Sequence, residues 1–371
     1  MINDWFVEGT ALDTPLRRML GVEVPIIQAG MAEGARADLV VAVSDAGGLG
    51  VLGAAPLTPE QLRDEIGKIR ERTDRPFGVN LVFPPEFTGG TSQLVEQAEK
   101  LLTDAPPEVR EELEEMVHIF EPGFVDRQVK ACLEEGARVL CSGLGMPRHV
   151  IDEFHSAGGR VFAQVGAVAQ ARRVAQLGVD GVIASGTDAG GHTGHIGSLS
   201  LWAACVEAVD LPVVASGGIT DGRTLAAALV LGCQGVWCGT RFFATREMAV
   251  HDRAKQHLTE AGTDDTVVTR AFSGKPMRVV RNDYVDSWKG RDREILPFPA
   301  QFLASEGRGR RGLLRGDVEG GAIQAGQGVG LIHSVESAGD VVRSMAREAL
   351  ACLARVAGPM AQPAVGARSS G

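Results

Sequence analysis

Eight short apolar segments, each bounded by glycine or proline, constrain the fold of this chain more than any other feature. They begin at Pro25, Gly48, Pro76, Ala137, Arg160, Asp180, Pro212 and Gly235. Valine, isoleucine and leucine follow one another in these segments without alternating with polar residues. Strands that are buried on both faces, as in parallel sheets, have this pattern. The sequence therefore predicts eight buried parallel strands.

Helical patterns separate most of these strands. Residues 58–73, 169–178 and 221–232 are examples, and a helix end, a glycine and a strand recur in that order along the chain. Asp221 is the expected N-cap of the third example, and Gly232 is its expected stop signal. Eight strands that alternate with helices predict an α/β fold of the (β/α)₈ TIM-barrel type.

The strand pattern divides the chain into three parts. We assign residues 1–245 to the barrel and residues 246–357 to a helical and irregular segment that covers the active site and ends in a terminal helix. Residues 358–371 are expected to be a disordered tail. Within the barrel, residues 84–117 are expected to form a long loop with extra helices.

Two stretches of the post-barrel segment carry more specific expectations. Residues 264–288 lack a clear period and are expected to be irregular. Residues 307–312 are basic and rich in glycine, so we expect them to form an exposed loop.

Composition narrows the function classes. The formal net charge is −10, which disfavours nucleic-acid binding. No apolar stretch has the length of a membrane span, and the N-terminus lacks the pattern of a secretory signal. The six cysteines include no C-x-x-C pair. These features predict a soluble, reduced, cytoplasmic protein without a membrane or nucleic-acid partner.

The stretch TDAGGHTGHIGS, residues 187–198, follows the sixth predicted strand. Active sites of such barrels lie at the carboxyl ends of the strands, so His192 is expected at the barrel mouth as an acid–base group. A structural role in the loop is the alternative. We interpret His195 as structural or solvent-facing. The pair predicts no metal site, because zinc needs three or four ligands.

The loops after the seventh and eighth strands are expected to bind a phosphate. Gly217 and Gly218 would let backbone N–H groups approach it, and the helix that begins near Asp221 would add its dipole. Gly239 and Thr240 would close the other side. Tight turns after buried strands are the alternative interpretation.

Other residues at strand ends have two interpretations each. Asn80 and Gln164 could hydrogen-bond a bound ring or simply end their strands, and Met31 could pack on a flat ring or in the core. Cys141 and Cys238 are interpreted as small packing residues, because nothing beside them would lower a thiol pKa.

A dinucleotide-binding fingerprint is a competing motif. Gly48, Gly50 and Gly53 have the G-x-G-x-x-G spacing. That motif needs a helix to begin within it. Pro56 and Pro59 fall where its first turns would be, so we do not predict a Rossmann fold.

The motifs PIIQAGM, GGLGVLGA, PFGVNL, DAGGHTG, PVVASGGITDG and GTRF occur in this order. Together they resemble the nitronate monooxygenase (2-nitropropane dioxygenase) family and its close relative, the flavin-type enoyl-acyl carrier protein reductase. The resemblance covers nearly the whole chain, including GDVEGGAIQAGQGVGLI. It implies a barrel that holds non-covalent FMN.

The resemblance also implies roles for single residues. His192 matches the catalytic histidine, Met31 and Asn80 would contact the flavin ring, and Gln164 would lie beside the ribityl chain. Ser185 stands where many members have glutamine, which puts one flavin hydrogen bond in question. Further FMN-binding positions are Gly190, Gly218, Trp237, Cys238, Gly239 and Thr240.

The resemblance implies an FMN-dependent oxidoreductase. In the first interpretation, an alkyl nitronate reduces the flavin, oxygen reoxidises it, and a carbonyl compound and nitrite form. His192 would remove the carbon-bound proton of a neutral nitroalkane or stabilise the nitro group's charge. The alternative is an NAD(P)H-dependent enoyl-thioester reductase, in which His192 helps to protonate or orient the substrate. A non-catalytic FMN-binding protein is a third reading. The sequence does not decide among nitronate, enoyl-thioester and quinone substrates, or between a monomer and a homodimer.

Overall fold

Eight parallel strands form the centre of the protein in the computed structural model, which describes residues 9–83, 119, 121–298, 300–305 and 307–360. The strands are β1 (Ile26–Gln28), β2 (Gly50–Gly53), β3 (Phe77–Val82), β4 (Val139–Gly143), β5 (Arg160–Val165), β6 (Gly181–Ser185), β8 (Val213–Ser216) and β9 (Gly235–Cys238). Their spatial order is β1-β9-β8-β6-β5-β4-β3-β2. The predicted strands and the (β/α)₈ barrel are confirmed.

The barrel closes between β1 and β2, where the ladder is shortest. Ile27 and Leu49 form a single parallel bridge. The fully buried Gln28 side chain extends this contact: its Oε1 accepts from the Val51 N–H at 3.0 Å, and its Nε2 donates to the Val51 carbonyl at 3.2 Å and to the Ala29 carbonyl. One amide side chain therefore supplies hydrogen bonds that a longer strand pair would make through its backbone.

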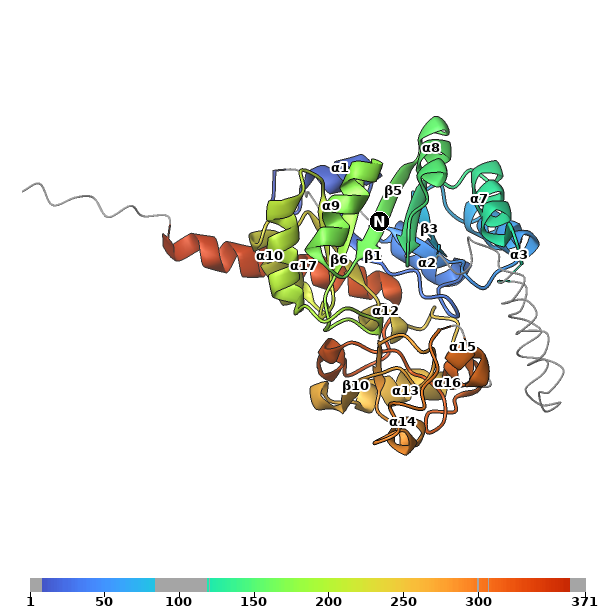
Figure 1. The fold of residues 1–371 in the computed structure, drawn as a ribbon. Helices are drawn as coiled ribbons and strands as arrows, with labels where there is room; N and C mark the ends of the chain where they lie inside the picture. The colour runs from blue at the N-terminus through green and yellow to red at the C-terminus, as the bar shows by residue number, and fades with distance from the viewer. Residues whose placement is uncertain (1–8, 84–118, 120, 299, 306, 361–371) are drawn as a thin grey trace, which may run out of the picture.

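Helices surround the barrel (Figure 1). They are α2 (Ala37–Asp45), α3 (Pro59–Arg70), α7 (Phe124–Glu134), α8 (Arg148–Ser156), α9 (Val168–Leu177), α10 (Ser198–Ala208) and α11 (Gly222–Val230). The three helices predicted from periodicity are confirmed as α3, α9 and α11. Asp221 caps α11 as expected, since its side chain accepts from the Thr224 N–H at 3.0 Å. Gly232 follows the helix with a φ of +94°. Residues 84–117 lie outside the described residues, so the expected loop there stays a prediction.

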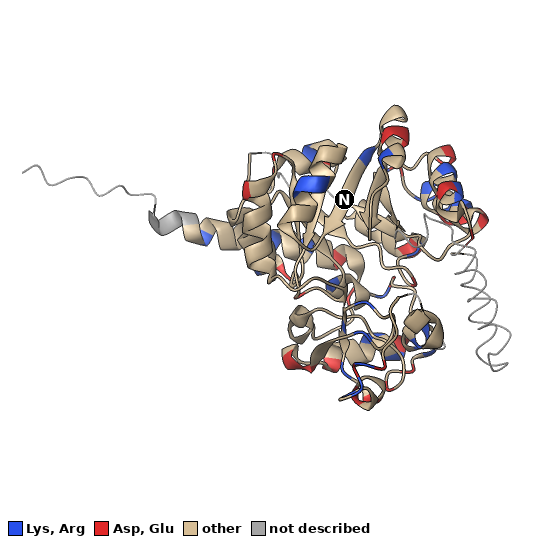
Figure 2. Ribbon diagram, in the orientation of Figure 1, with Lys and Arg blue, Asp and Glu red and all other residues tan. Residues whose placement is uncertain are grey.

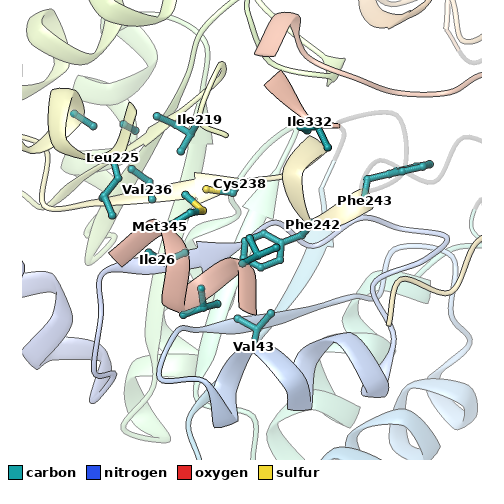
Figure 3. Close-up of a cluster of buried hydrophobic side chains, with 14 of the residues drawn as sticks. Ile26, Val43, Ile219, Leu225, Val236, Cys238, Phe242, Phe243, Ile332 and Met345 are labelled. Carbon is teal, nitrogen blue, oxygen red and sulfur yellow. The ribbon is translucent and has the colours of Figure 1, made fainter. Parts of the chain in front are cut away.

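Alternate strand residues face two separate apolar layers. In β9, Trp237 packs inside the barrel, whereas Val236 and Cys238 pack in the layer between the strands and the helices. Figure 3 shows Cys238 in that outer layer near Phe242 and Met345. The helix α1 (Pro15–Leu20) adds Leu16 and Leu20 to the interior layer. The barrel is therefore filled rather than hollow.

A second body of structure, the cap (described residues between 246 and 337), lies at one end of the barrel beside α12 (Thr240–Phe243) (Figure 1). Its elements are α13 (Asp252–Glu260), η2 (Thr263–Asp265), β10 (Thr266–Thr269), β11 (Met277–Val280), α14 (Asp283–Ser287), α15 (Ala300–Ala304), α16 (Arg308–Arg315) and η3 (Gln327–Leu331).

The cap differs from the sequence expectation in two places. Residues 264–288 are not irregular, because β10 and β11 form an antiparallel hairpin from Thr266↔Val280 to Thr269↔Met277. Residues 307–312 are not an exposed loop, because α16 begins there between two left-handed glycines, Gly307 and Gly316. Arg310 of this helix forms a half-buried ion pair with Glu33, at 3.0 Å, on the barrel side.

The hairpin joins the barrel through β7 (Gly191–His192), a two-residue strand in the loop after β6. Met277 pairs with His192 and Arg278 pairs with Gly191, so the sheet order is β10-β11-β7. The Arg278 Nε also donates to the Thr187 carbonyl at 2.9 Å. The cap is therefore tied to the loop that carries His192.

The C-terminal helix α17 (Ala338–Met360) packs on α11 and α2 of the barrel. Glu348 accepts from the Gly222 N–H at 2.8 Å, and a Cβ at Gly222 would lie only 2.4 Å from the Ala349 nitrogen. Residues 358–360, which were expected to belong to the disordered tail, form the end of this helix. The rest of that tail lies outside the described residues.

Charged residues of both signs are interspersed on the barrel helices (Figure 2). Arg63 and Glu134, for example, pair at 2.8 Å between α3 and α7. Among the described residues, no helix is both long and apolar enough to span a membrane.

We predict that Gln28→Met lowers the free energy of unfolding. The variant keeps the side chain's length but leaves the buried Val51 N–H and carbonyl unpaired, at about 1–3 kcal/mol for each buried group. Urea denaturation followed by circular dichroism measures the change. Gln256→Met, at an exposed helical position, is the control and should change stability little. Equal stabilities of the two variants would show that Gln28 does not hold the barrel closed.

Candidate active site

Polar side chains line the inner face of the barrel at the carboxyl ends of its strands. Ser185, Ser216 and Trp237 stand in register across β6, β8 and β9. The Ser216 hydroxyl donates to the Ser185 hydroxyl at 3.5 Å, and both side chains are buried. Trp237 belongs to the apolar interior beneath the mouth. The arrangement places one apolar indole ring beside two hydroxyl groups.

Three other residues that were predicted to contact a ring lie on the flanking strand β5, after the flanking strand β1, and on β3 across the barrel. Asn80 is buried and donates from Nδ2 to the Cys141 carbonyl at 3.0 Å, which holds the amide in place. Met31 is half-buried and packs on the interior layer that includes Trp237. Gln164 is also half-buried, near the end of β5. The structure thus brings these residues and Ser185 to the same end of the barrel.

The turn after β8 has the geometry of an anion cradle. Gly217 and Gly218 have φ values of +100° and +76°. A Cβ at Gly218 would meet only the Asp188 Cβ, at 3.7 Å. The N–H groups of Gly218 and Ile219 donate to no acceptor within the described residues, and the buried Thr220 hydroxyl has no partner there either. Free donors around open space suit a phosphate.

The α11 dipole was expected to attract the phosphate, but carboxylates of the protein already bind the N–H groups at the start of this helix. Asp221 accepts from the Thr224 N–H, and Glu348 of α17 accepts from the Gly222 N–H. These two carboxylates already occupy the positive end of the helix. Sequence reasoning named Asp221 as the cap but could not place Glu348 there, because that contact depends on how α17 packs.

The far side of the cradle is built by the cap. Thr240 accepts through Oγ1 from the Gly326 N–H at 2.9 Å, and the Gln327 N–H donates to the Asp188 carbonyl at 2.9 Å. A Cβ at Gly190 would lie 2.7 Å from the Ala325 carbonyl carbon, so Gly190 permits close packing of this segment. Sequence reasoning did not single out Gly326 or Gln327 as site residues.

Gly239 and Cys238, two of the predicted cofactor-binding residues, could contact a ligand only through their backbone. Gly239 has a φ of −95°, so its backbone does not require glycine. The Cys238 thiol faces the outer apolar layer, and its carbonyl accepts from the Ala29 N–H at 2.9 Å. Burial raises the pKa of the Cys238 and Cys141 thiols, which agrees with packing roles for both.

His192 lies on β7 with its side chain exposed at the mouth. Its Nε2 is 2.9 Å from the Ser273 Oγ, which belongs to the turn between β10 and β11. His195 is exposed and makes no hydrogen bond within the described residues. The structure therefore distinguishes the two histidines, and it adds Ser273 to the site. Among the described residues, no group of three or more His, Cys, Asp or Glu side chains could hold a metal ion.

The surroundings favour a neutral His192. Surrounding protein atoms desolvate the ring, and the Lys275 ammonium repels a second positive charge, so the pKa falls from 6.5 to about 4. The side chain is also more than a third exposed to solvent, so water limits the desolvation of the ring. At pH 7 the ring is mainly neutral with either pKa and can accept a proton.

Comparison with known proteins places this geometry in a family. The family model described as "Nitronate monooxygenase" matches residues 13–348. A "Probable nitronate monooxygenase" of Staphylococcus haemolyticus is 36% identical over 298 residues, which cover 77% of this chain and 83% of that protein. FabK from Thermotoga maritima superposes with a TM-score of 0.77 at 33% identity, covering 92% of this chain and 98% of FabK. Nitroalkane oxidase from Streptomyces ansochromogenes superposes with a TM-score of 0.77 at 30% identity, and the match covers 92% of this chain and 99% of that protein.

We predict that His192 titrates below 6.5 in the folded protein. Lys275→Met should raise this pKa but leave it below 6.5, because burial is the larger cause of the shift. Because the folded state disfavours the charged ring, the unfolded state takes up this proton at a higher pH than the folded state. The contribution of His192 to the stability of the fold is therefore complete above pH 6.5 and falls as the pH drops toward the folded pKa. A histidine NMR titration measures the pKa. A value at or above 6.5 in the unsubstituted protein would contradict the prediction.

Proposed function

The chain belongs to the nitronate monooxygenase family of oxidoreductases, and from this premise we propose that it binds FMN and oxidises alkyl nitronates. Oxygen would be the second substrate, and a carbonyl compound and nitrite the products. The observation that carries an FMN-dependent oxidation is the anion cradle at Gly218 and Ile219, which lies at the same barrel mouth as an exposed, neutral histidine.

The described residues fit FMN as a cofactor. The N–H groups of Gly218 and Ile219 and the hydroxyl of Thr220 would hold its phosphate, with Thr240 on the far side. One cradle suits a mononucleotide better than a dinucleotide, which needs a second nucleotide site.

The ring system would use the remaining residues of the mouth. It would lie over the Trp237 indole ring, with Met31, Asn80, Gln164 and Ser185 around it. Bound FMN supplies the two-electron redox chemistry, while the protein positions the substrate and handles its proton.

The proton-handling role falls to His192. A neutral imidazole can remove the proton from the carbon beside a nitro group, and this step converts a neutral nitroalkane into the nitronate anion. The Lys275 ammonium acts electrostatically on His192 and would favour the negative charge that develops on the substrate. Lys275 packs its ammonium over the Phe298 ring at 4.2 Å, which fixes its place in the cap.

An NAD(P)H-dependent enoyl-thioester reductase is the second candidate, supported by the likeness to FabK. Both functions use the same cradle and the same histidine, so the match to the nitronate monooxygenase family, rather than the site, favours the nitronate as substrate. A non-catalytic FMN-binding protein would need no exposed base at the mouth.

Anaerobic mixing separates these candidates. The purified protein is mixed without oxygen with an alkyl nitronate, NADH or NADPH, and bleaching of the flavin absorbance is followed. The proposal expects rapid bleaching by the nitronate, and nitrite should appear when air is admitted. Bleaching by a nicotinamide alone supports the reductase, and no bleaching by any of the three supports the non-catalytic reading.

We predict that Gly218→Val strongly reduces FMN content. The side chain would fill the space in front of the Gly218 and Ile219 N–H groups and strain a backbone with a φ of +76°. Gly290→Val is the matched control, because Gly290 has the same φ of +76° and open space around it, but lies in the cap away from the cradle. Released cofactor is identified by mass spectrometry. Full FMN content in Gly218→Val, or release of FAD, would refute the cradle.

We predict that His192→Ala retains FMN but loses about 10²–10⁴-fold in turnover of neutral nitroalkanes, the usual contribution of general base catalysis. A preformed nitronate has already lost its proton, so the loss with that substrate should be smaller. His195→Ala is the control and should lose little.

Steady-state rates with both substrates decide this prediction. Equal losses with nitroalkane and nitronate would indicate that His192 acts in binding or electrostatics rather than as a base. Unchanged nitroalkane turnover in His192→Ala, or greater damage in His195→Ala, would contradict the assignment.

A further inference from the structure

Only one of the two ring nitrogens of His192 contacts the cap. The His192 Nε2 lies 2.9 Å from the Ser273 Oγ, and Ser273 is only 3% exposed. The other ring nitrogen, Nδ1, has no hydrogen-bond partner among the described residues. The protein therefore holds one nitrogen and leaves the other available.

Ser273 is itself held by a tight turn. Its Oγ accepts from the Lys275 N–H at 3.3 Å and donates to the Lys275 carbonyl at 3.2 Å. The Gly274 N–H donates to the Arg270 carbonyl at 2.8 Å, and the Arg270 Nε donates to the Gly274 carbonyl at 3.1 Å. Gly274 has a φ of +82°, and a Cβ there would lie 2.5 Å from the Phe298 nitrogen. The turn is thus wedged between its own strands and the segment around Phe298.

A hydroxyl group carries one hydrogen, so the direction of the His192 contact depends on where the Ser273 hydrogen points. Two acceptors for this hydrogen lie within the hairpin, the Lys275 carbonyl at 3.2 Å and the Met277 Sδ at 4.0 Å. When the hydrogen is used there, the Ser273 oxygen can only accept from His192. In that arrangement Nε2 carries the proton of the neutral imidazole, and Nδ1 carries the lone pair. A hydrogen bond to one ring nitrogen commonly fixes which nitrogen of a neutral histidine carries the proton.

We propose that Ser273 is a positioning residue, which holds His192 in the Nε2–H tautomer so that Nδ1 is the nitrogen that accepts the substrate proton. The role of Nδ1 rests on the proposed function, in which His192 is the base. The tautomer itself rests only on the contacts of Ser273. Ser273 takes no part in the bond changes of the substrate and acts only through His192.

Backbone pairing makes this role separable from folding. β7 is held to β11 by the register Met277↔His192 and Arg278↔Gly191, and the Arg278 side chain adds a bond to the Thr187 carbonyl. None of these contacts uses the Ser273 hydroxyl. Loss of the hydroxyl should therefore free the imidazole while leaving the strand that carries it in place.

The test measures the tautomer directly by NMR of protein labelled with ¹⁵N-histidine, with His192→Ala used to assign the signal. At a pH where the ring is neutral, the unsubstituted protein should show Nε2 protonated and Nδ1 unprotonated. Ser273→Ala should show a mixture of tautomers, and Ser273→Thr should restore the single tautomer because it keeps the hydroxyl.

Kinetics and a control complete the design. Ser273→Ala should lose about 10–100-fold in kcat with a neutral nitroalkane, as expected on removal of a partner that orients a histidine, with little change in KM. Ser273→Thr should recover most of this loss. Ser305→Ala is the control, since the Ser305 hydroxyl is also buried in the cap but donates to the Phe302 carbonyl. It should leave the tautomer and kcat unchanged.

The outcomes separate this inference from the proposed function. A protonated Nδ1 in the unsubstituted protein would overturn the inference without any variant, and so would an unchanged tautomer in a folded Ser273→Ala. If Ser273→Ala fails to fold, the tautomers of the unsubstituted protein and of Ser273→Thr still decide. If the tautomer behaves as expected but no nitroalkane is oxidised, Ser273 positions His192 as inferred and the proposed substrate is wrong.

Discussion

The pairing of β11 with the two-residue strand β7 is the interaction on which the site depends. It joins a hairpin formed far along the chain to the loop after β6, and its register sets Met277 opposite His192. Without this pairing, the two-residue strand that carries His192 would lose its backbone register with the cap. The Arg278 side chain reinforces the same joint by donating to the Thr187 carbonyl. Barrel and cap therefore share one small sheet at the mouth.

The glycines of the loop after β6 serve this joint in different ways. Gly190 allows the backbone at Ala325 and Gly326 to approach closely, and Gly191 adopts a φ of +76° at the start of β7. A Cβ at Gly194 would lie 2.9 Å from the Gly166 carbonyl oxygen, so this glycine lets the loop pack on the end of β5. Close packing therefore explains several of the glycines in residues 187–198, which from the sequence alone indicated a ligand site. The same packing positions the histidine.

Sequence reasoning was strongest where the determinants are local. Apolar segments bounded by glycine or proline correctly predicted the barrel strands, and Asp221 was correctly predicted to be the N-cap of α11. It failed where the partner is distant in sequence: the hairpin at 266–280 needs β7 beside it, and Glu348 reaches the start of α11 only because α17 packs there. Ser216 could have been identified as a residue of the inner face from the sequence. It follows Val214 by two residues, and side chains two residues apart on a strand point to the same face. Ser273 gave no comparable signal.

The proposed site requires that the β7–β11 pairing hold His192 over a cofactor whose phosphate lies in the turn after β8. A crystal structure of the protein with FMN bound tests this arrangement. We expect the phosphate within hydrogen-bond distance of the Gly218 N–H, the ring system over Trp237, and His192 facing the ring with its Nε2 still at the Ser273 hydroxyl. A phosphate bound elsewhere, or a His192 turned away from the ring with β7 unpaired from β11, would contradict it.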